Sequence, residues 1–132
     1  MTTLIETQPT KIDAATLLQL QLRQLEERQV IVHCLFKCPP SRELLIRIWK
    51  TTFLIDNHSS HKSKLLFFDN ISLYPEWTLV KAGSRFKFTL LFSGLPEDCV
   101  SFDLFEDIPA AGGFYIPAIV RNKTDVYSVE IV

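Results

Sequence analysis

Glycine is scarce in this chain, with four residues among 132. The glycines stand at positions 83, 94, 112 and 113, each within a stretch of turn-forming residues. A phosphate-binding loop needs several closely spaced glycines between a strand and a helix. No stretch of this sequence has that spacing, so the usual signal for nucleotide phosphates is missing.

A surplus of positive charge is also missing. The 14 Lys and Arg residues nearly balance 15 Asp and Glu residues, which gives a formal net charge of −1. Proteins that bind nucleic acid concentrate Lys and Arg to displace counterions from the phosphates. We therefore expect no nucleic-acid partner.

Long apolar runs are absent as well. No segment approaches the roughly 18 uninterrupted apolar residues that a bilayer span requires, and the N-terminus lacks the basic and apolar regions of a signal peptide. Three cysteines, an odd number without dense spacing, fit a reducing compartment better than a disulfide scaffold. We expect a cytoplasmic protein without a membrane partner.

Residues 1–29 form the first expected unit, a polar tail followed by one amphipathic helix that begins after Asp13. The helix is favoured because residues 14–29 contain neither Gly nor Pro. Leu18, Leu22 and Leu25 recur at i, i+4 and i+7, which places them on one helix face. These leucines must dock, because an isolated helix of this length is marginal in water. The sequence leaves open whether they dock on the same chain or on a second copy.

Residues 30–132 form the second expected unit, an antiparallel β-sandwich of six to eight strands. Its clearest strand is 85–92, where Phe86, Phe88, Leu90 and Phe92 alternate with more polar residues, so that one face is dry and the other wet. Other strands are expected where β-branched and aromatic residues gather between turns, at 30–36, 43–56, 64–71, 100–104, 114–120 and 126–132.

Residue types used in metal binding do not form a recognised motif. His58 and His61 make an HxxH pair inside the polar stretch 57–63, an expected hairpin loop. A zinc site needs about four ligands, and the spacing of Cys34 and Cys38 is not that of a zinc knuckle. We expect no metal, no cofactor and no catalytic residue.

Acidic residues cluster at Glu97 and Asp98, and again at Asp103, Glu106 and Asp107. Two carboxylates in a cleft serve glycosidases, and calcium is bound by six to eight oxygens. The spacing here matches no calcium loop, and acids at loop edges commonly serve solubility. We expect these carboxylates to be solvated.

The positions of Cys34, Trp49 and Cys99 resemble the Cys–Trp–Cys core of immunoglobulin domains. That resemblance covers about residues 30–132 and implies an immunoglobulin-like sandwich preceded by one helix. Glu97 stands where the family has a tyrosine two residues before the second cysteine, and we expect no disulfide. The run TTFLIDNHSSHKSKLLFFDNISLYPEW, with LLFSGLPEDCVSFDLFE after it, is similar to small bacterial β-sandwich domains of unassigned function.

Aromatic residues exceed what one face of a small sheet can bury. By alternation Phe105 faces away from the core, and Phe67, Tyr74 and Trp77 are difficult to bury together with their neighbours. We therefore expect a non-catalytic interaction module that binds a protein partner or itself through an aromatic sheet face, the helix, or both. Two alternatives remain open: a small-ligand or carbohydrate site at Tyr74 and Trp77, and a metal-assisted enzyme that uses the two loop histidines and a carboxylate.

Overall fold

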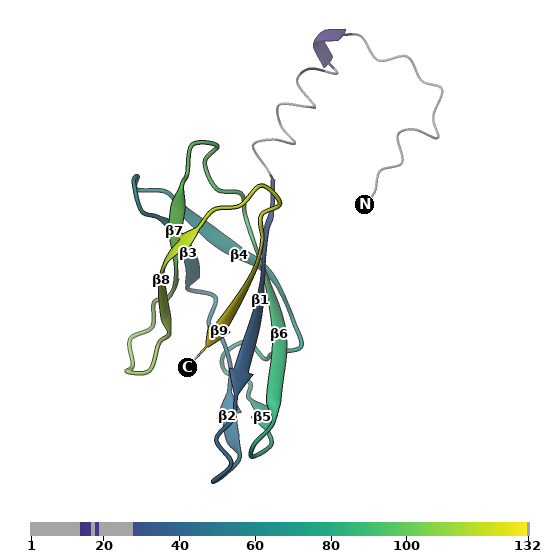
Figure 1. Cartoon of the computed structure of the whole chain (residues 1–132), viewed down its shortest axis with the longest axis vertical. Helices are drawn as coiled ribbons and strands as arrows, with labels where there is room; N and C mark the ends of the chain where they lie inside the picture. Colours follow the sequence, from purple (N-terminus) through teal and green to yellow (C-terminus); the bar gives the residue numbers. More distant parts are fainter. Residues whose placement is uncertain (1–13, 17, 19–27, 132) are drawn as a thin grey trace, which may run out of the picture.

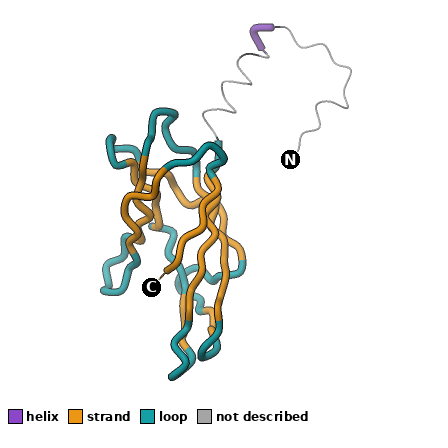
Figure 2. Tube along the Cα trace, viewed as in Figure 1, coloured by secondary structure: helices purple, strands orange, loops and turns teal. Residues whose placement is uncertain are grey.

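The computed structural model describes residues 14–16, 18 and 28–131. Within these ranges the chain is mainly β, as the sequence predicted, and it contains nine strands (Figures 1 and 2). Their bounds are β1 (Val30–Lys37), β2 (Leu44–Ile46), β3 (Thr52–Asp56), β4 (Lys62–Asp69), β5 (Thr78–Val80), β6 (Arg85–Phe92), β7 (Ser101–Glu106), β8 (Tyr115–Val120) and β9 (Val126–Ile131).

Seven strands form one sheet in the order β8-β7-β3-β4-β6-β1-β9, and β2 pairs with β5 in a small second sheet. The large sheet is mixed, because β1 pairs antiparallel with β6 and parallel with β9. The expected antiparallel pairing is thus not confirmed for β9, while the other named strand pairs of the described residues are antiparallel. The physical reason is that residues 121–125 carry the chain from one edge strand, β8, to the opposite edge, where β9 runs in the direction of β1.

The long strand expected at 43–56 is two strands in different sheets. The break between β2 and β3 is a turn in which Thr52 donates to the carbonyl oxygen of Trp49 from its backbone N–H at 3.1 Å and from its hydroxyl at 2.7 Å.

Val100 lies outside the strand that was expected at 100–104. It is exposed and precedes β7, whereas Phe102 and Leu104 are buried as the alternation indicated.

Strand β4 folds the large sheet over on itself. Its first residues, 62–64, pair with β3. Leu65 and residues 67–69 pair with β6, and the register shifts between Leu65 and Phe67. The two halves therefore face each other across the core, where the ring of Phe102 on β7 meets the ring of Tyr127 on β9 edge to face at 5.0 Å. A bulge at this position is consistent with a strand that bends from one half to the other.

The buried face of β6 confirms the clearest sequence pattern. Phe88, Leu90 and Phe92 are buried in the core and Phe86 packs against it, while Lys87 is exposed. Burial of such side chains is the main favourable contribution to folding, at roughly 25 cal/mol for each Å² of apolar surface removed from water.

A buried charge network closes the end of the fold between the two halves. Asp125 is fully buried and accepts hydrogen bonds from Arg121, at 3.1 and 3.2 Å, and from the Tyr127 hydroxyl at 2.9 Å. Arg28 adds an ion pair at 3.2 Å to the same carboxylate. The network fixes the residues that enter β1 to the connection between β8 and β9.

The expected N-terminal helix is described only in part. Ala14–Thr16 and Leu18 are helical, and Leu18 is 56% exposed. Leu22 and Leu25 lie outside the described residues. The helix was expected to extend to Gln29, but Arg28 and Gln29 are not helical. No helix in the described ranges has the length and hydrophobicity to cross a membrane.

Candidate functional site

A cation and three aromatic rings gather where the chain leaves β2. The guanidinium carbon of Arg47 is 3.7 Å from the ring centre of Trp77, 4.5 Å from that of Tyr74 and 5.8 Å from that of Trp49. The rings of Trp49 and Tyr74 also stack, with centres 3.9 Å apart. A guanidinium within about 6 Å of a ring centre is attracted by the electrons of the ring face. We refer to these four residues as the Arg47 cluster.

The backbone beside β2 explains how the Arg47 cluster forms. Ile48 is buried, donates to the carbonyl of Ser72 at 2.9 Å and accepts from the N–H of Tyr74 at 2.8 Å. Successive side chains of an extended segment point to opposite sides. Arg47 and Trp49, on either side of Ile48, therefore share one side of the segment, and the backbone pairing brings Tyr74 next to them.

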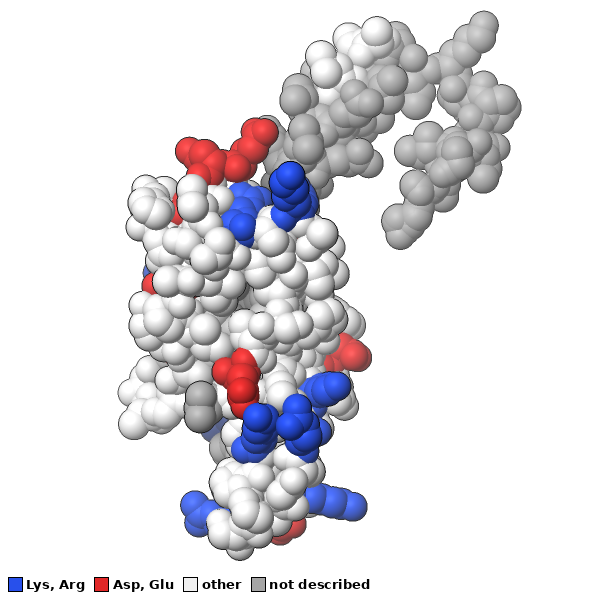
Figure 3. All heavy atoms as spheres, in the orientation of Figure 1, with Lys and Arg blue, Asp and Glu red and all other residues white. Residues whose placement is uncertain are grey.

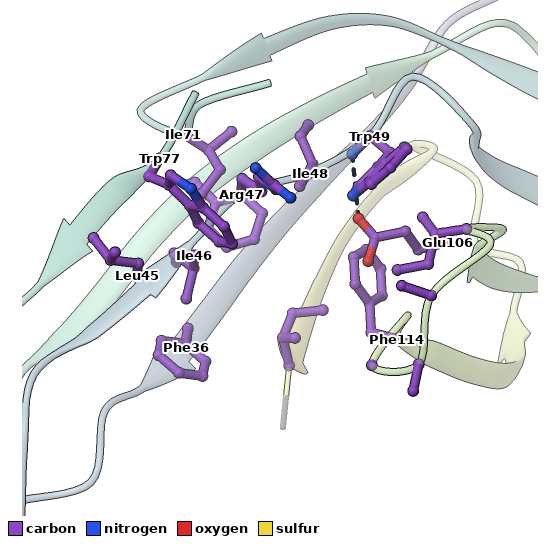
Figure 4. Close-up of a pocket in the computed structure, with 16 residues that line it drawn as sticks. Phe36, Leu45, Ile46, Arg47, Ile48, Trp49, Ile71, Trp77, Glu106 and Phe114 are labelled. Atoms are coloured by element: carbon purple, nitrogen blue, oxygen red, sulfur yellow. Dashed lines mark hydrogen bonds between the residues drawn. The ribbon is translucent and has the colours of Figure 1, made fainter. Parts of the chain in front are cut away.

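A cavity of about 420 Å³ opens beside the cluster (Figure 4). Its lining combines segments that are distant in the sequence: Phe36 of β1, Phe114 before β8, Ile131 of β9 and the two tryptophans. The other residues that line it are Leu45, Ile46, Arg47, Ile48, Ile71, Phe88, Glu106, Ile108, Ala110, Ala111 and Gly112. An apolar concave site with a few polar groups is the usual form of a ligand-binding pocket.

Glu106 is the carboxylate in this apolar lining. It lies at the end of β7 on the same face as the core residues Phe102 and Leu104, and it is only 5% exposed. The backbone N–H of Trp49 donates to its Oε2 at 3.2 Å, shown as the dashed line in Figure 4. Burial raises the pKa of Glu106, although backbone hydrogen bonds from Trp49 and Phe114 and the charge of Arg47 act to lower it.

The glutamate and the arginine give the cavity two different polar groups. The ion pairs found among residues 28–131 do not join Glu106 to Arg47. Arg47 Nη1 instead donates to the carbonyl of Pro75 at 3.1 Å. Arg47 has five N–H donors, so the site presents donors at its edge and a carboxyl group in its wall.

The HxxH pair lies in the loop between β3 and β4, as expected. The ring Nε2 of His61 is 3.0 Å from the hydroxyl of Ser63 and 3.1 Å from the carbonyl of Gly94. Asp56 accepts from the backbone N–H of His58 at 3.0 Å. These bonds shape a turn. In the part of the chain that the structure describes, no three His, Cys, Asp or Glu residues are grouped so as to hold a metal ion.

The three cysteines are buried and unpaired. Burial raises the pKa of the Cys34 thiol to about 12, and burial together with the charge of Asp56 raises that of Cys99 to about 11. The thiolate is the reactive form of cysteine, so both thiols are held in their unreactive state. Trp49 stacks on Tyr74 at the cavity rather than on a disulfide.

The aromatic residues expected at an interface lie in three places. Tyr74 and Trp77 meet in the Arg47 cluster, and both are about half exposed. Phe67 is 60% exposed on the outer face of the sheet, next to Leu91 of β6. Phe105 also faces outward, but the ring of Tyr115 packs edge to face against it at 5.8 Å. The four residues therefore do not form one surface.

Reasoning from the sequence missed two residues of the candidate site. Arg47 has no distinguishing spacing in the sequence, and the aromatic rings that it contacts come from distant positions. Glu106 was grouped with the solvated acids, which is wrong for this residue because it is buried. The signal was present, since Glu106 continues the alternation of Phe102 and Leu104 onto the dry face of β7.

Charged side chains gather toward the two ends of the molecule in the view of Figure 3. A broad band between them carries few Lys, Arg, Asp or Glu atoms.

Comparisons of this chain with protein-family models, with curated proteins and with solved structures found no match.

Proposed function

We propose that residues 30–131 form a non-catalytic binding domain that takes an apolar segment of a protein partner at the mouth of the cavity. The observation that carries this proposal is a continuous apolar surface that runs from the outer face of β2 and β5 into the cavity. The surface consists of Leu45, Leu79 and Trp77, and we call it the β2–β5 patch.

The β2–β5 patch is built by strand register. Leu45 and Leu79 are directly opposite each other in the β2–β5 ladder, and each is 53% exposed. Trp77 precedes Leu79 by two residues and therefore lies on the same face. Single exposed leucines are ordinary, but a contiguous group with an aromatic residue is typical of an interaction surface.

The cavity adds depth to this surface. Leu45 and Trp77 belong to both the β2–β5 patch and the cavity lining. Binding energy at protein interfaces concentrates where a large side chain of the partner enters a dry pocket. An apolar side chain of the partner would contact Phe36 and Ile131 inside, while its neighbours in the segment cover the patch.

The polar groups of the cavity match a peptide main chain. A peptide offers both carbonyl oxygens and N–H groups, and buried polar groups must be paired with one another. The free N–H donors of Arg47 suit the carbonyls, and the carboxylate of Glu106 suits the N–H groups. The apolar lining and these two groups together support a peptide over a highly charged ligand.

A small ligand or carbohydrate is the second candidate, and the concave site lined by Trp77 favours it. Sugars bind proteins by stacking on an aromatic face. The guanidinium of Arg47 already covers one face of the Trp77 ring, and this weakens the carbohydrate hypothesis relative to the peptide. The metal-assisted enzyme has less support, because the hydrogen bonds of His61 engage Ser63 and Gly94.

The finer features of fold and location belong to the same proposal. The sheet folded over its core supports an immunoglobulin-like sandwich, while the parallel β1–β9 pair departs from an all-antiparallel one. The unpaired cysteines support a reducing compartment such as the cytoplasm.

A displayed library of random peptides tests this function. We expect selection of peptides rich in apolar residues, and titration calorimetry with a selected peptide should show affinity at least tenfold weaker for Leu79→Asp and Leu45→Asp, a loss of about 1.4 kcal/mol or more. The matched control is Val120→Asp, which changes a 74% exposed residue of β8 and should leave affinity unchanged. Selected peptides that bind both patch variants as tightly as the wild type would contradict the proposal, as would binding of a saccharide panel in place of peptides.

A further inference from the structure

The large sheet ends in two edge strands, β8 and β9, and the fold protects them unequally. An edge strand presents unpaired N–H and C=O groups to which another chain can add. β8 contains Pro117, which lacks an N–H, and its ladder with β7 shifts register between Phe102 and Leu104. Ala118 has a φ of +54°, and its N–H donates to the side chain of Asp103 at 2.8 Å. Proline and an irregular register keep another strand from pairing with β8.

β9 has neither of these protections. It contains no proline, and it pairs with β1 in continuous register from Val126 to Ile131. Its one charged residue, Glu130, forms an ion pair with Lys37 at 3.0 Å. β9 is therefore a regular edge strand that another strand can join.

Alternate residues of β9 direct their backbone groups away from β1. The N–H of Ile31 donates to the carbonyl of Asp125 at 2.9 Å, so Asp125 and every second residue after it face β1 in the parallel ladder. The N–H and C=O groups of Ser128 and Glu130 therefore face outward. Within the residues that the structure describes, no hydrogen bond reaches these four groups.

The core-facing side chains beside this edge are incompletely covered. Val129 and Ile131 pack against the core but are only partly buried, whereas Tyr127 at the start of the strand is 6% exposed. Ile131 also lines the cavity, together with Ile108 and Phe114 from the β7–β8 connection. A strand added beside β9 would cover these side chains and place one of its own core-facing residues opposite Ile131.

We propose that the partner segment is extended and joins the large sheet as an added strand, hydrogen-bonded to Ser128 and Glu130 of β9. This inference rests on the proposed function and gives its partner a sequence pattern: apolar residues at every second position and no proline where the segment pairs with β9. Main-chain hydrogen bonds supply affinity in this mode of recognition, and pockets for alternate side chains supply specificity. Beyond Ile131 the segment would reach the β2–β5 patch through the cavity, which Leu45 and Trp77 also line.

A separate segment fits this edge better than a second copy of β9 does. In a second copy, β1 follows β9 at one strand spacing, about 4.8 Å. β8 and the β7–β8 connection lie on the side of β9 away from β1 (Figure 1), and residues of that connection share the cavity with Ile131. A whole second sheet would meet this part of the chain, whereas a single extended segment brings no further strand.

Methylation of the partner's backbone tests the pairing. A peptide selected from the displayed library is synthesised with a methyl group on one backbone nitrogen at a time, and titration calorimetry gives each affinity. We expect binding at least tenfold weaker at alternate positions of the paired stretch, because every second N–H points to β9 and the others point away. Equal affinities for all methylated peptides, or losses without this alternation, would overturn strand addition.

Ser128→Pro is the matching change in the protein. Proline at this position removes an outward N–H and no bond of the β1–β9 ladder, so the fold should tolerate it. We expect the selected peptide to bind at least tenfold more weakly, while Ser60→Pro, in the exposed β3–β4 loop, is the control and should keep wild-type affinity. If Ser128→Pro does not fold, amide exchange in the wild type decides: the amides of Ser128 and Glu130 should exchange at least tenfold more slowly with peptide bound. Unchanged exchange would overturn the proposal.

The outcomes distinguish strand addition from the proposed function. Peptide binding that Leu79→Asp weakens, but that Ser128→Pro and N-methylation leave unchanged, would overturn strand addition alone. Binding that Ser128→Pro weakens and Leu79→Asp does not would support strand addition and contradict the β2–β5 patch. A library that yields no binding peptide would overturn both. A dimer in light scattering that Ser128→Pro dissociates would show that a second copy takes the edge, and it would overturn addition of a separate segment.

Discussion

The guanidinium carbon of Arg47 lies 3.7 Å from the ring centre of Trp77, and both residues line the cavity. This contact joins the segment after β2 to the segment before β5, beyond the three paired residues of each strand. A ladder of that length has little stability of its own. The cation–aromatic contact therefore contributes to holding the β2–β5 patch in shape.

Replacement of Arg47 by methionine is the first test of that contact. Arg47→Met keeps an apolar stem but removes the charge and the hydrogen bond to Pro75, and we expect the free energy of unfolding to fall by about 1–2 kcal/mol. Tryptophan emission should also shift, because both tryptophans of the chain lie within 6 Å of this guanidinium. Arg85→Met, at an exposed position of β6, is the control. Unchanged stability and emission in Arg47→Met would show that the cluster is incidental.

The buried carboxyl group of Glu106 gives a prediction about pH. Its pKa is raised in the folded state by burial, so the folded protein holds this proton more tightly than the unfolded chain does. The associated stability is fully present below the unfolded pKa and is lost as pH rises through the folded pKa, at about 1.4 kcal/mol per unit of pKa difference. Urea unfolding of Glu106→Gln from about pH 4 to about pH 8 should lack this loss.

Asp103 is expected to change stability with pH in the opposite direction to Glu106, because its pKa is lowered in the folded state. Burial acts to raise its pKa, but hydrogen bonds from Asn57, from the backbone of Ala118 and from Tyr115 together lower it. Its contribution to stability is present above the unfolded pKa and is lost as pH falls through the folded pKa. Asp103→Asn should therefore flatten the acid side of the curve and leave the neutral side unchanged. For Glu106, stability-against-pH curves of Glu106→Gln and the wild type that run parallel from about pH 4 to about pH 8 would contradict a raised pKa in the folded state.

The sequence alone predicted those parts of the fold in which one local pattern decides the outcome. The alternation in 85–92 placed Phe88, Leu90 and Phe92 in the core because a half-buried strand permits one dry face. The break inside 43–56 was not predictable in this way. Every residue there is compatible with a strand, and the turn from Trp49 to Thr52 forms because β2 and β3 have partners in different sheets.

The cavity was beyond local patterns for a related reason. Phe36 and Ile131 are paired in the parallel β1–β9 ladder, and Phe114, which precedes β8, meets them at the cavity only after the sheet has folded over at β4. Tyr74 and Trp77 were recognised as surplus aromatics, yet their partner Arg47 carries no distinguishing local spacing. Long-range register and a cation that three rings share are properties of the assembled sheet, so they require the structure.

The carboxylate of Asp125 is expected to be essential for stability. It is fully buried, it binds Arg121 with two hydrogen bonds, and the side chain of Arg121 is only 12% exposed. Loss of one partner of a buried ion pair leaves the other charge uncompensated, at a cost of about 3–5 kcal/mol. Asp125→Ala should fall in that range in urea unfolding, and Asp98→Ala, an exposed acid, should change stability little.

The substitution Asp125→Asn separates the effect of the lost charge on stability from the effect of backbone conformation. Asp125 has a φ of +53°, a value that Asn tolerates better than Ala does. Asp125→Asn should therefore lose the ion pair but keep the turn, and it should be less destabilised than Asp125→Ala. Equal losses in the two variants would assign the whole effect to the charge.

The two adjacent glycines before β8 are expected to respond differently to alanine. A Cβ at Gly113 would lie 2.5 Å from the carbonyl oxygen of Glu106, a backbone atom that the β7 ladder holds in place. At Gly112 there is open space, but φ is +100° and alanine adopts it with strain. Both substitutions should lower the free energy of unfolding by about 1–3 kcal/mol.

Of the two substitutions, only Gly113→Ala should alter the cavity lining, because it displaces the end of β7 that carries the Glu106 carboxyl group. Gly113→Ala should therefore alter the neutral-pH dependence of stability that Glu106 produces, while Gly112→Ala keeps the wild-type dependence at lower overall stability. Urea unfolding of both variants across the same pH range measures the difference. If the two curves differ from the wild type by the same constant offset, the close approach of Gly113 to β7 has no part in positioning Glu106.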